Sequence, residues 1–149
     1  MSEQDPLHAL TLDHQLCFAL YSTSLAMTKA YKPLLKELGL TYPQYLAMLA
    51  LWQNDGLTVG ALSKRLLTDP GSLTPLLKRL ERDGFLERRR GPDDERVVTL
   101  CLTRKGWELR TRAAHVPGCM MQASTFSSER LMALKNELVT LREQLLKTP

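Results

Sequence analysis

Apolar residues recur at helical spacing through the first third of the chain. From residue 8 to about residue 36 they form one stripe: Leu12, Leu16, Ala19, Leu20, Met27, Ala30 and Leu34. This period predicts a long amphipathic first helix, with Thr11 as its N-cap. Gly39 interrupts the stripe, and the run Thr41-Tyr42-Pro43-Gln44 then has the form of a capping box with proline in the first turn. A second helix is expected to continue to about residue 53 and to bury Tyr45, Met48, Leu49 and Trp52.

Two shorter amphipathic segments follow. The run Asn54-Asp55-Gly56 ends the second helix, and Thr58 can cap a third helix. That helix should bury Val59, Leu62 and Leu66 and leave Lys64 and Arg65 outside. A turn at residues 69–72 precedes a fourth helix, which we expect Ser72 to cap and Gly84 to end. Its inward face is predicted to hold Leu73, Leu76, Leu77 and Leu80. Two short helices joined by a tight turn, the second polar and basic on its outside, predict a helix-turn-helix.

The next segment has the pattern of a β-hairpin. Residues 85–90 and 96–102 are β-type runs, and the turn sequence Gly91-Pro92-Asp93-Asp94-Glu95 separates them. Arginines lie on both sides of the turn, as in the wing of a winged helix. The predicted fold class is therefore mostly α with a small β-hairpin wing, the winged helix-turn-helix covering about residues 42–102.

The last part of the chain is predicted to be helical. Thr103 is expected to cap a helix that continues to about residue 123 and kinks at Pro117-Gly118. Ser127 is expected to cap a final helix with a narrow leucine seam at Leu131, Leu134, Leu138, Leu141 and Leu145. We expect residues 8–36 and 103–147 to be dimerisation helices of a single domain that spans residues 1–149. So much apolar surface on these helices predicts an obligate homodimer.

Composition and charge narrow the class of protein. A chain of 149 residues with 44% hydrophobic content can bury one core. The first residues, MSEQDPLHAL, do not resemble a signal peptide, and no stretch is long enough to span a bilayer, so we expect a cytoplasmic protein without a membrane partner. The formal net charge is +4, and ten of the twenty lysines and arginines fall between Lys78 and Arg110. A local basic surface of this kind favours binding to a polyanion such as DNA.

The cysteines and histidines do not form a metal site or a disulfide framework. The chain has three cysteines, Cys17, Cys101 and Cys119, with no CxxC spacing. The three histidines lack a second ligand at suitable spacing, so we expect no metal, no cofactor and no catalytic residue. By spacing alone Cys17 is typical of a small buried apolar residue, and Cys101 of a packed strand residue.

Residues 57–106 resemble the core of the MarR family of bacterial regulators. The matching motifs are Asp94-Glu95-Arg96 in the wing and Leu102-Thr103-Arg104-Lys105-Gly106 at the next helix start. The resemblance implies that Asp94 orients Arg96, which enters the minor groove of DNA. It also implies that the fourth helix enters the major groove, with contacts from Ser72, Thr74, Pro75, Lys78 and Arg79.

The first helix resembles that of the organic hydroperoxide resistance regulators within this family. The resemblance implies that Cys17 senses peroxide and that the hydroxyls of Tyr31 and Tyr42 hydrogen-bond its sulfur. The positive end of the helix that contains Tyr42 would also favour a thiolate at Cys17. Cys119 is at about the position of a resolving thiol, and a buried structural cysteine is the alternative.

These implications together give one hypothesis and two alternatives. In the hypothesis, a reduced homodimer binds a palindromic operator and represses. An organic hydroperoxide oxidises Cys17 to a sulfenic acid, and a disulfide with Cys119 of the partner subunit, or with a small thiol, then releases the DNA. One alternative is a repressor released by a small aromatic acid, which would act in reducing buffer. The other is a thiol peroxidase using Cys17 and Cys119, which would consume peroxide steadily with a thiol reductant.

Overall fold

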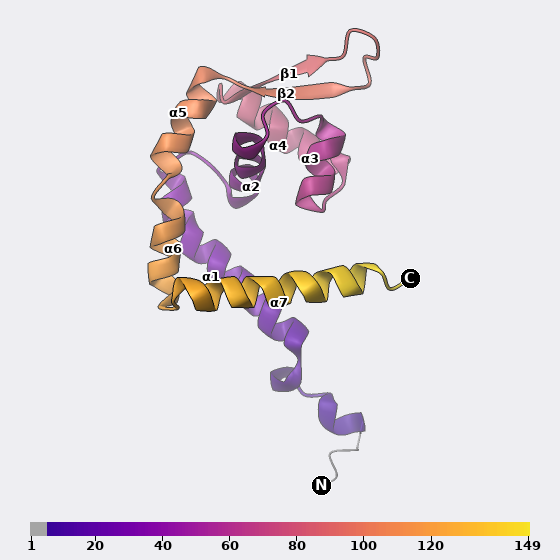
Figure 1. Cartoon of the computed structure of the whole chain (residues 1–149), viewed down its shortest axis with the longest axis vertical. Coiled ribbons are helices and arrows are strands. Elements are labelled where there is room, and N and C mark those ends of the chain that lie inside the picture. Colours follow the sequence, from indigo (N-terminus) through magenta and orange to yellow (C-terminus); the bar gives the residue numbers. More distant parts are fainter. Residues whose placement is uncertain (1–5) are drawn as a thin grey trace. The chain divides into compact units, whose positions relative to one another are not determined.

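The computed structural model describes residues 6–149, which form helices and one β-hairpin (Figure 1). In chain order the elements are the 3-10 helices η1 (Pro6–Ala9) and η2 (Leu12–His14), then α1 (Leu16–Lys36), α2 (Tyr42–Gln53), α3 (Val59–Leu66), α4 (Pro70–Arg82), β1 (Leu86–Arg90), β2 (Val98–Leu102), α5 (Arg104–Ala113), α6 (Val116–Ser124) and α7 (Ser128–Leu146). The chain divides into two compact units, one ending at Ala113 and one comprising Ala114–Pro149. Among residues 6–149 no helix combines the length and apolar character that a membrane crossing requires. The predicted fold class, mostly α with a hairpin wing, is confirmed.

The first long helix begins later than the sequence predicted. Thr11 precedes only η2, and its side chain caps no backbone N–H. The Thr11 hydroxyl instead contacts Nδ1 of His14, while the side-chain amide of Gln15 donates to the Thr11 carbonyl at 3.1 Å. These local bonds compete with a continuous helix, so α1 starts at Leu16. Cys17 is consequently the second residue of α1 rather than a mid-helix residue.

The predicted caps of α2 and α3 are confirmed. The Thr41 hydroxyl accepts from the Gln44 backbone N–H, and the Gln44 side chain accepts from the Thr41 N–H at 2.9 Å, which completes the capping box. The Thr58 hydroxyl accepts from the Ala61 N–H at 3.1 Å. Both caps were visible in the sequence because they involve residues three positions apart.

Two parts of the predicted core of these helices are wrong. Leu49 of α2 is 39% exposed, whereas the small residues Ala47 and Ala50 of the same helix are buried. Val59 and Leu66 of α3 are only half-buried, so Leu62 is the main α3 residue in the core. The spacing of apolar residues gave the faces of these helices only approximately, because α2 packs against α1, α3, α4 and β2 at once.

Helix α4 starts three residues earlier than predicted. Asp69, not Ser72, is its N-cap, and the Asp69 carboxylate accepts from the Ser72 backbone N–H at 3.0 Å. Pro70 occupies the first turn, where a missing N–H costs nothing. At the other end Gly84 has φ of +87°, and the Phe85 N–H donates to the Leu80 carbonyl at 3.0 Å, which confirms the glycine stop. The buried face is Leu73, Leu77 and Leu80, with Leu76 half-buried.

The hairpin is fixed to the helical core through its second strand. β1 and β2 pair antiparallel, with Leu86 opposite Leu102 and Arg90 opposite Val98. The Leu100 N–H donates to the Leu57 carbonyl at 2.8 Å, and the Gly56 N–H donates to the Leu100 carbonyl at 3.0 Å. The segment before α3 thus extends the two-stranded sheet at its inner edge. The base of the wing is therefore held by backbone hydrogen bonds.

The start of α5 lies against the corner between α4 and β1. The Thr103 hydroxyl accepts from the Gly106 N–H at 3.1 Å, which confirms the predicted cap, and the Thr103 N–H donates to the Phe85 carbonyl at 3.1 Å. The Trp52 indole donates to the Gly106 carbonyl at 2.9 Å. A Cβ at position 106 would lie 2.1 Å from the Phe85 carbonyl oxygen, so only glycine fits there.

The chain after α5 breaks where a kinked helix was predicted. α5 ends at Ala113 and α6 begins at Val116, with Pro117 in the first turn of α6. The prediction of one helix to residue 123 was therefore wrong, because a new helix start accommodates proline better than a helix interior does. Ser127 caps α7 as predicted, accepting from the Arg130 N–H at 3.1 Å. None of the seam leucines of α7 is buried in the single chain.

The close contact at Gly106 gives a stability prediction. Gly106→Ala should lower the free energy of unfolding by about 2 kcal/mol or more, because the added methyl group meets backbone that cannot move alone. Gly118→Ala is the matched control, since a Cβ there meets nothing within 4 Å. It should leave stability unchanged or raise it by up to about 1 kcal/mol. Urea denaturation at one fixed protein concentration measures both, and equal effects would contradict the packing described for Gly106.

Candidate nucleic-acid interface and thiol site

Helix α4 exposes every residue that the resemblance assigned to contacts in the major groove. These residues are Ser72, Thr74, Pro75, Lys78 and Arg79. The Ser72 hydroxyl donates to the Asp69 carboxylate at 2.8 Å, and the Thr74 hydroxyl donates to the Pro70 carbonyl at 3.2 Å. The Ser72 hydroxyl, and then its backbone N–H, hold the pKa of Asp69 below its ordinary value. The outer face of α4 therefore carries small polar side chains near its N-terminus and basic side chains, including Lys78 and Arg79, nearer its C-terminus.

At the tip of the hairpin Asp94 holds Arg96. The Asp94 carboxylate accepts from the Arg96 backbone N–H at 3.0 Å, from Nε at 3.1 Å and from Nη2 at 3.3 Å. The side-chain hydrogen bond, followed by the backbone one, lowers the pKa of Asp94. The Arg96 side chain is nonetheless 92% exposed. The aspartate thus orients an arginine that remains free to reach a ligand.

The tip loop is tightly closed. The Gly91 N–H donates to the Val97 carbonyl at 2.8 Å, and the Val97 N–H donates to the Asp94 carbonyl at 3.1 Å. A Cβ at position 91 would lie 2.8 Å from the Asp94 carbonyl oxygen, so glycine permits the closure. This loop keeps Arg96 two residues before the start of β2.

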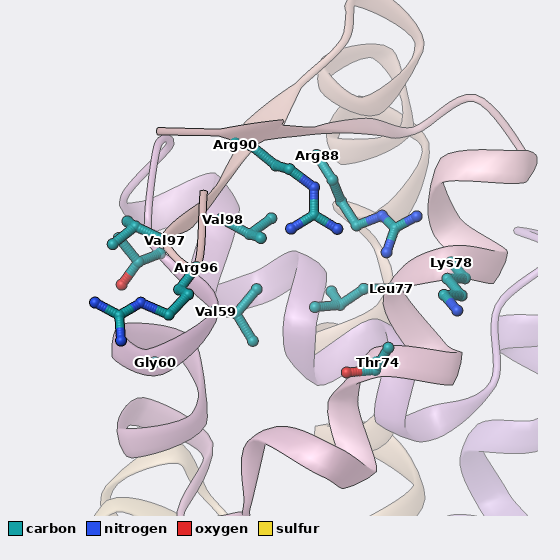
Figure 2. A pocket seen from close by; sticks show the side chains of 11 residues that line it. Val59, Gly60, Thr74, Leu77, Lys78, Arg88, Arg90, Arg96, Val97 and Val98 are labelled. Carbon is teal, nitrogen blue, oxygen red and sulfur yellow. The ribbon is translucent and has the colours of Figure 1, made fainter. Parts of the chain in front are cut away.

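A groove of about 640 Å³ lies between the start of α3, α4 and the hairpin (Figure 2). It is lined by Thr58, Val59, Gly60, Thr74, Leu77, Lys78, Arg88, Arg90, Arg96, Val97 and Val98. Four of these residues are cationic and none is acidic. Figure 2 shows the side chains of Arg88 and Arg90 extending from the hairpin toward α4. A concave surface of this charge suits a polyanion.

Sequence reasoning missed Arg88 and Arg90 as site residues. The three arginines of β1 alternate, so that Arg88 and Arg90 line the groove and Arg89 does not. Side chains alternate between the two faces of a strand, so the sequence could have put Arg88 and Arg90 on one face and Arg89 on the other. Which face lines the groove could not be read from the sequence. Arg90 donates to the Glu95 carbonyl at 2.8 Å, whereas Lys78 has no hydrogen-bond or ion-pair partner within residues 6–149.

The three cysteines are free thiols in different surroundings. Cys17 is exposed in the first turn of α1, so in the single chain it is not the buried apolar residue that its spacing alone suggested. Cys101 lies in β2 opposite Glu87 and is half-buried. Cys119 lies in α6 and is also half-buried. Cys17 is therefore the exposed thiol of the three.

The structure groups the predicted tyrosines with a third one. The rings of Tyr31 and Tyr42 have centroids 5.0 Å apart, and those of Tyr31 and Tyr45 are 5.7 Å apart. Burial, and then the neighbouring Tyr42, raise the pKa of Tyr31, so its phenol keeps its proton at neutral pH. Tyr45, predicted only as a core residue, is the member of this cluster that the sequence analysis missed.

Within one chain Cys17 does not meet these tyrosines. Cys17 and Tyr31 lie fourteen residues apart on the continuous helix α1. At 1.5 Å per residue this separation is about 21 Å. The predicted association of Cys17 with Tyr31 and Tyr42 therefore cannot form inside a single protomer. Residues 6–149 also contain no group of three or more His, Cys, Asp or Glu side chains placed to hold a metal ion.

Comparison with known proteins places this architecture in a family. Residues 40–98 match the model of the MarR family. The chain is 48% identical over 136 residues to the organic hydroperoxide resistance transcriptional regulator of Bacillus subtilis, covering 91% of this chain and 92% of that protein. AbfR of Staphylococcus epidermidis has a TM-score of 0.79 at 30% identity, with 95% and 98% of the two chains covered. AbfR in its reduced, DNA-bound form gives a TM-score of 0.77 at 29% identity, with 93% and 96% covered. The resemblance inferred from the motifs is confirmed, and this chain belongs to the MarR family of winged-helix regulators.

Proposed function

We propose that this protein is a DNA-binding repressor that an organic hydroperoxide releases from its operator by oxidising Cys17. The observation that carries the DNA-binding part is the basic groove, which lies between the polar face of α4 and the hairpin and contains four cations and no carboxylate. The redox part rests on the exposed thiol in the first turn of α1 and on the similarity to the hydroperoxide regulator of Bacillus subtilis.

In this proposal α4 enters the major groove of DNA and the hairpin tip reaches the minor groove. Thr74 and Lys78 would face base edges, since both are exposed on α4 and line the groove. Arg96 would enter the minor groove in the orientation that Asp94 sets. Arg90, which also lines the groove, would contact the phosphate backbone between the two, and release of counterions would supply much of the affinity.

The protein would act as a homodimer through its terminal helices. α1 exposes several large apolar side chains in the single chain, namely Leu16, Phe18, Tyr21, Leu25 and Met27. α7 does the same with Met132, Leu134, Leu145 and Leu146. A surface of this extent is typical of an interface that a second copy covers. Two copies related by a twofold axis would present two α4 helices to the half-sites of a palindromic operator.

The sensing site would then combine residues of two protomers. Because α1 separates Cys17 from the tyrosines of its own chain, the hydroxyls that reach Cys17 would come from Tyr31 and Tyr42 of the partner subunit. The tyrosine hydroxyls would donate to the sulfur before oxidation and to the sulfenate oxygen afterwards.

The organic hydroperoxide is the oxidant in the proposed switch. The thiolate sulfur of Cys17 attacks one peroxide oxygen, the O–O bond breaks, and the alcohol leaves after taking a proton. The sulfur is oxidised to a sulfenic acid and the peroxide is reduced. A second thiol then forms an S–S bond with Cys17 and water leaves. We propose Cys119 of the partner subunit or a small thiol for this step, since Cys119 is a free and partly exposed thiol in α6.

The wing assignment is tested by Arg96→Ala. The variant should bind the operator about tenfold more weakly or worse, with a salt dependence flatter by about one phosphate contact per protomer. Arg89→Ala is the matched control, because Arg89 carries the same charge on the same hairpin and does not line the groove. It should bind within about threefold of wild type. Fluorescence anisotropy over a salt series measures both, and an Arg96→Ala variant that binds like wild type would refute the proposed role of the wing.

The sensor assignment is tested by Cys17→Ser. The variant should bind operator like the reduced wild type and stay bound when cumene hydroperoxide is added, because a hydroxyl cannot form a sulfenic acid. Cys101→Ser is the control and should release DNA like wild type. Gel-shift titrations measure the release of DNA, and intact-protein mass spectrometry detects the oxidation of the protein. Release of DNA by the Cys17→Ser variant would instead favour a repressor controlled by a bound ligand.

The two-protomer site is tested with mixed dimers. In the first dimer, one protomer carries Cys17→Ser and the other carries Tyr31→Phe with Tyr42→Phe. Its single Cys17 should oxidise at the wild-type rate, because the intact tyrosines face it from the partner. In the second dimer, one protomer is wild type and the other carries all three changes, and its single Cys17 should oxidise more slowly. Sulfenate trapping measures both rates, and the opposite order would show that the tyrosines act within their own chain.

A further inference from the structure

Glu81 joins the recognition helix to the hairpin. It lies on α4, and its carboxylate accepts two hydrogen bonds from one residue of β1, Arg88, with which it also forms an ion pair. The Arg88 backbone N–H donates at 2.8 Å, and Nε and Nη2 of the same arginine lie 3.1 Å from Oε1. No other side-chain hydrogen bond links α4 to the hairpin in the described part of the chain. The hairpin is thus attached to α4 at its first strand by this residue.

The pair is held more firmly than other surface ion pairs of the hairpin. The Arg88 and Glu81 side chains are 31% and 35% exposed, whereas those of the neighbouring Arg89–Glu87 pair are 66% and 58% exposed. The Arg88 backbone N–H, and secondarily its guanidinium, lower the pKa of Glu81, so the carboxylate is ionised at neutral pH. Because the Glu81 carboxylate binds both the backbone N–H and the side chain of Arg88, it fixes the position of the strand and also the direction of the guanidinium.

The placement of the charge is unusual for a surface that binds a polyanion. Arg88 lines the groove, but Glu81, which does not line it, neutralises its charge. A free arginine there would add affinity for any DNA sequence, because phosphate contacts carry no sequence information. A paired arginine adds less of this affinity and instead has a fixed position. The pair therefore reduces attraction to DNA in general and fixes the distance between hairpin and α4.

We propose that Glu81 is a specificity-determining positioning residue, which holds Arg88 and the first strand of the wing at a set distance from α4 and so favours the operator over other DNA. This inference rests on the proposed DNA-binding function. Glu81 acts through Arg88 and does not itself contact DNA. Without it, Arg88 becomes a mobile cation and the wing loses its fixed attachment to the helix that reads bases.

The test measures two affinities for each variant of the full-length protein. One duplex is selected by the wild-type protein from a random-sequence pool, and the other is a scrambled duplex of the same composition. Glu81→Gln should bind the selected duplex about tenfold more weakly and the scrambled duplex a few-fold more tightly. The salt slope for the scrambled duplex should steepen by about 0.9 for each freed Arg88 that contacts a phosphate. A variant that is merely less stable would lose affinity for both duplexes.

Glu87→Gln is the matched control. It makes the same change of charge on β1, directly before Arg88, and frees Arg89, which lies outside the groove. It should change both affinities by a similar factor and leave their ratio as in wild type. Thermal unfolding by circular dichroism, run on each variant, checks that folding is retained.

Arg88→Gln approaches the pair from the other side. It should lower the affinity ratio as well, and adding Glu81→Gln to it should change the ratio little further. An unchanged ratio in Glu81→Gln, or an equal effect of Glu81→Gln with and without Arg88, would overturn the inference while leaving the proposed function intact. A wild-type protein that selects no sequence from the pool would instead refute the DNA-binding function on which the inference depends.

Discussion

The position of the wing depends on the contact between the start of α5 and the corner that joins α4 to β1. A Cβ at Gly106 would lie 2.1 Å from the Phe85 carbonyl oxygen, and the Trp52 indole donates to the Gly106 carbonyl at 2.9 Å. Thr103 adds its cap and its own bond to Phe85. These contacts fix the last strand of the hairpin and the end of α4 against α2. The groove between α4 and the wing exists because both of its walls are attached to this corner.

The cations of the groove differ in how they are held. Asp94 orients Arg96 within the tip, Glu81 attaches Arg88 to α4, and the Glu95 carbonyl accepts from Arg90. Lys78 has no such partner in residues 6–149. Arginine suits positions at which a cation must be oriented, because its planar guanidinium can donate hydrogen bonds from two nitrogens at once. The lysine ammonium is instead a point charge on a flexible side chain. The groove can therefore combine general attraction to phosphate with a few side chains of fixed direction.

In our proposal both the redox chemistry and DNA binding require the homodimer. A continuous α1 keeps Cys17 about 21 Å from Tyr31 of its own chain. If the partner supplies the tyrosines, the surroundings of the Cys17 thiol are part of the dimer interface. A covalent change at Cys17 would then alter the packing of the same helices that set the distance between the two α4 helices.

The sequence by itself determined the features that involve residues close together along the chain. The caps at Thr41, Thr58 and Ser127 and the glycine stop at Gly84 join residues within a few positions, so local pattern was sufficient. The Asp94–Arg96 pair is equally local, but it was implied by the resemblance to the family. Tertiary structure alone decided which face of α2 is buried, why position 106 must be glycine, and that Arg88 and Arg90 line a groove. It also decided the Glu81–Arg88 attachment, which crosses from a helix to a strand. These features depend on how separate elements pack against one another, and hydrophobic spacing within one element does not specify its neighbours.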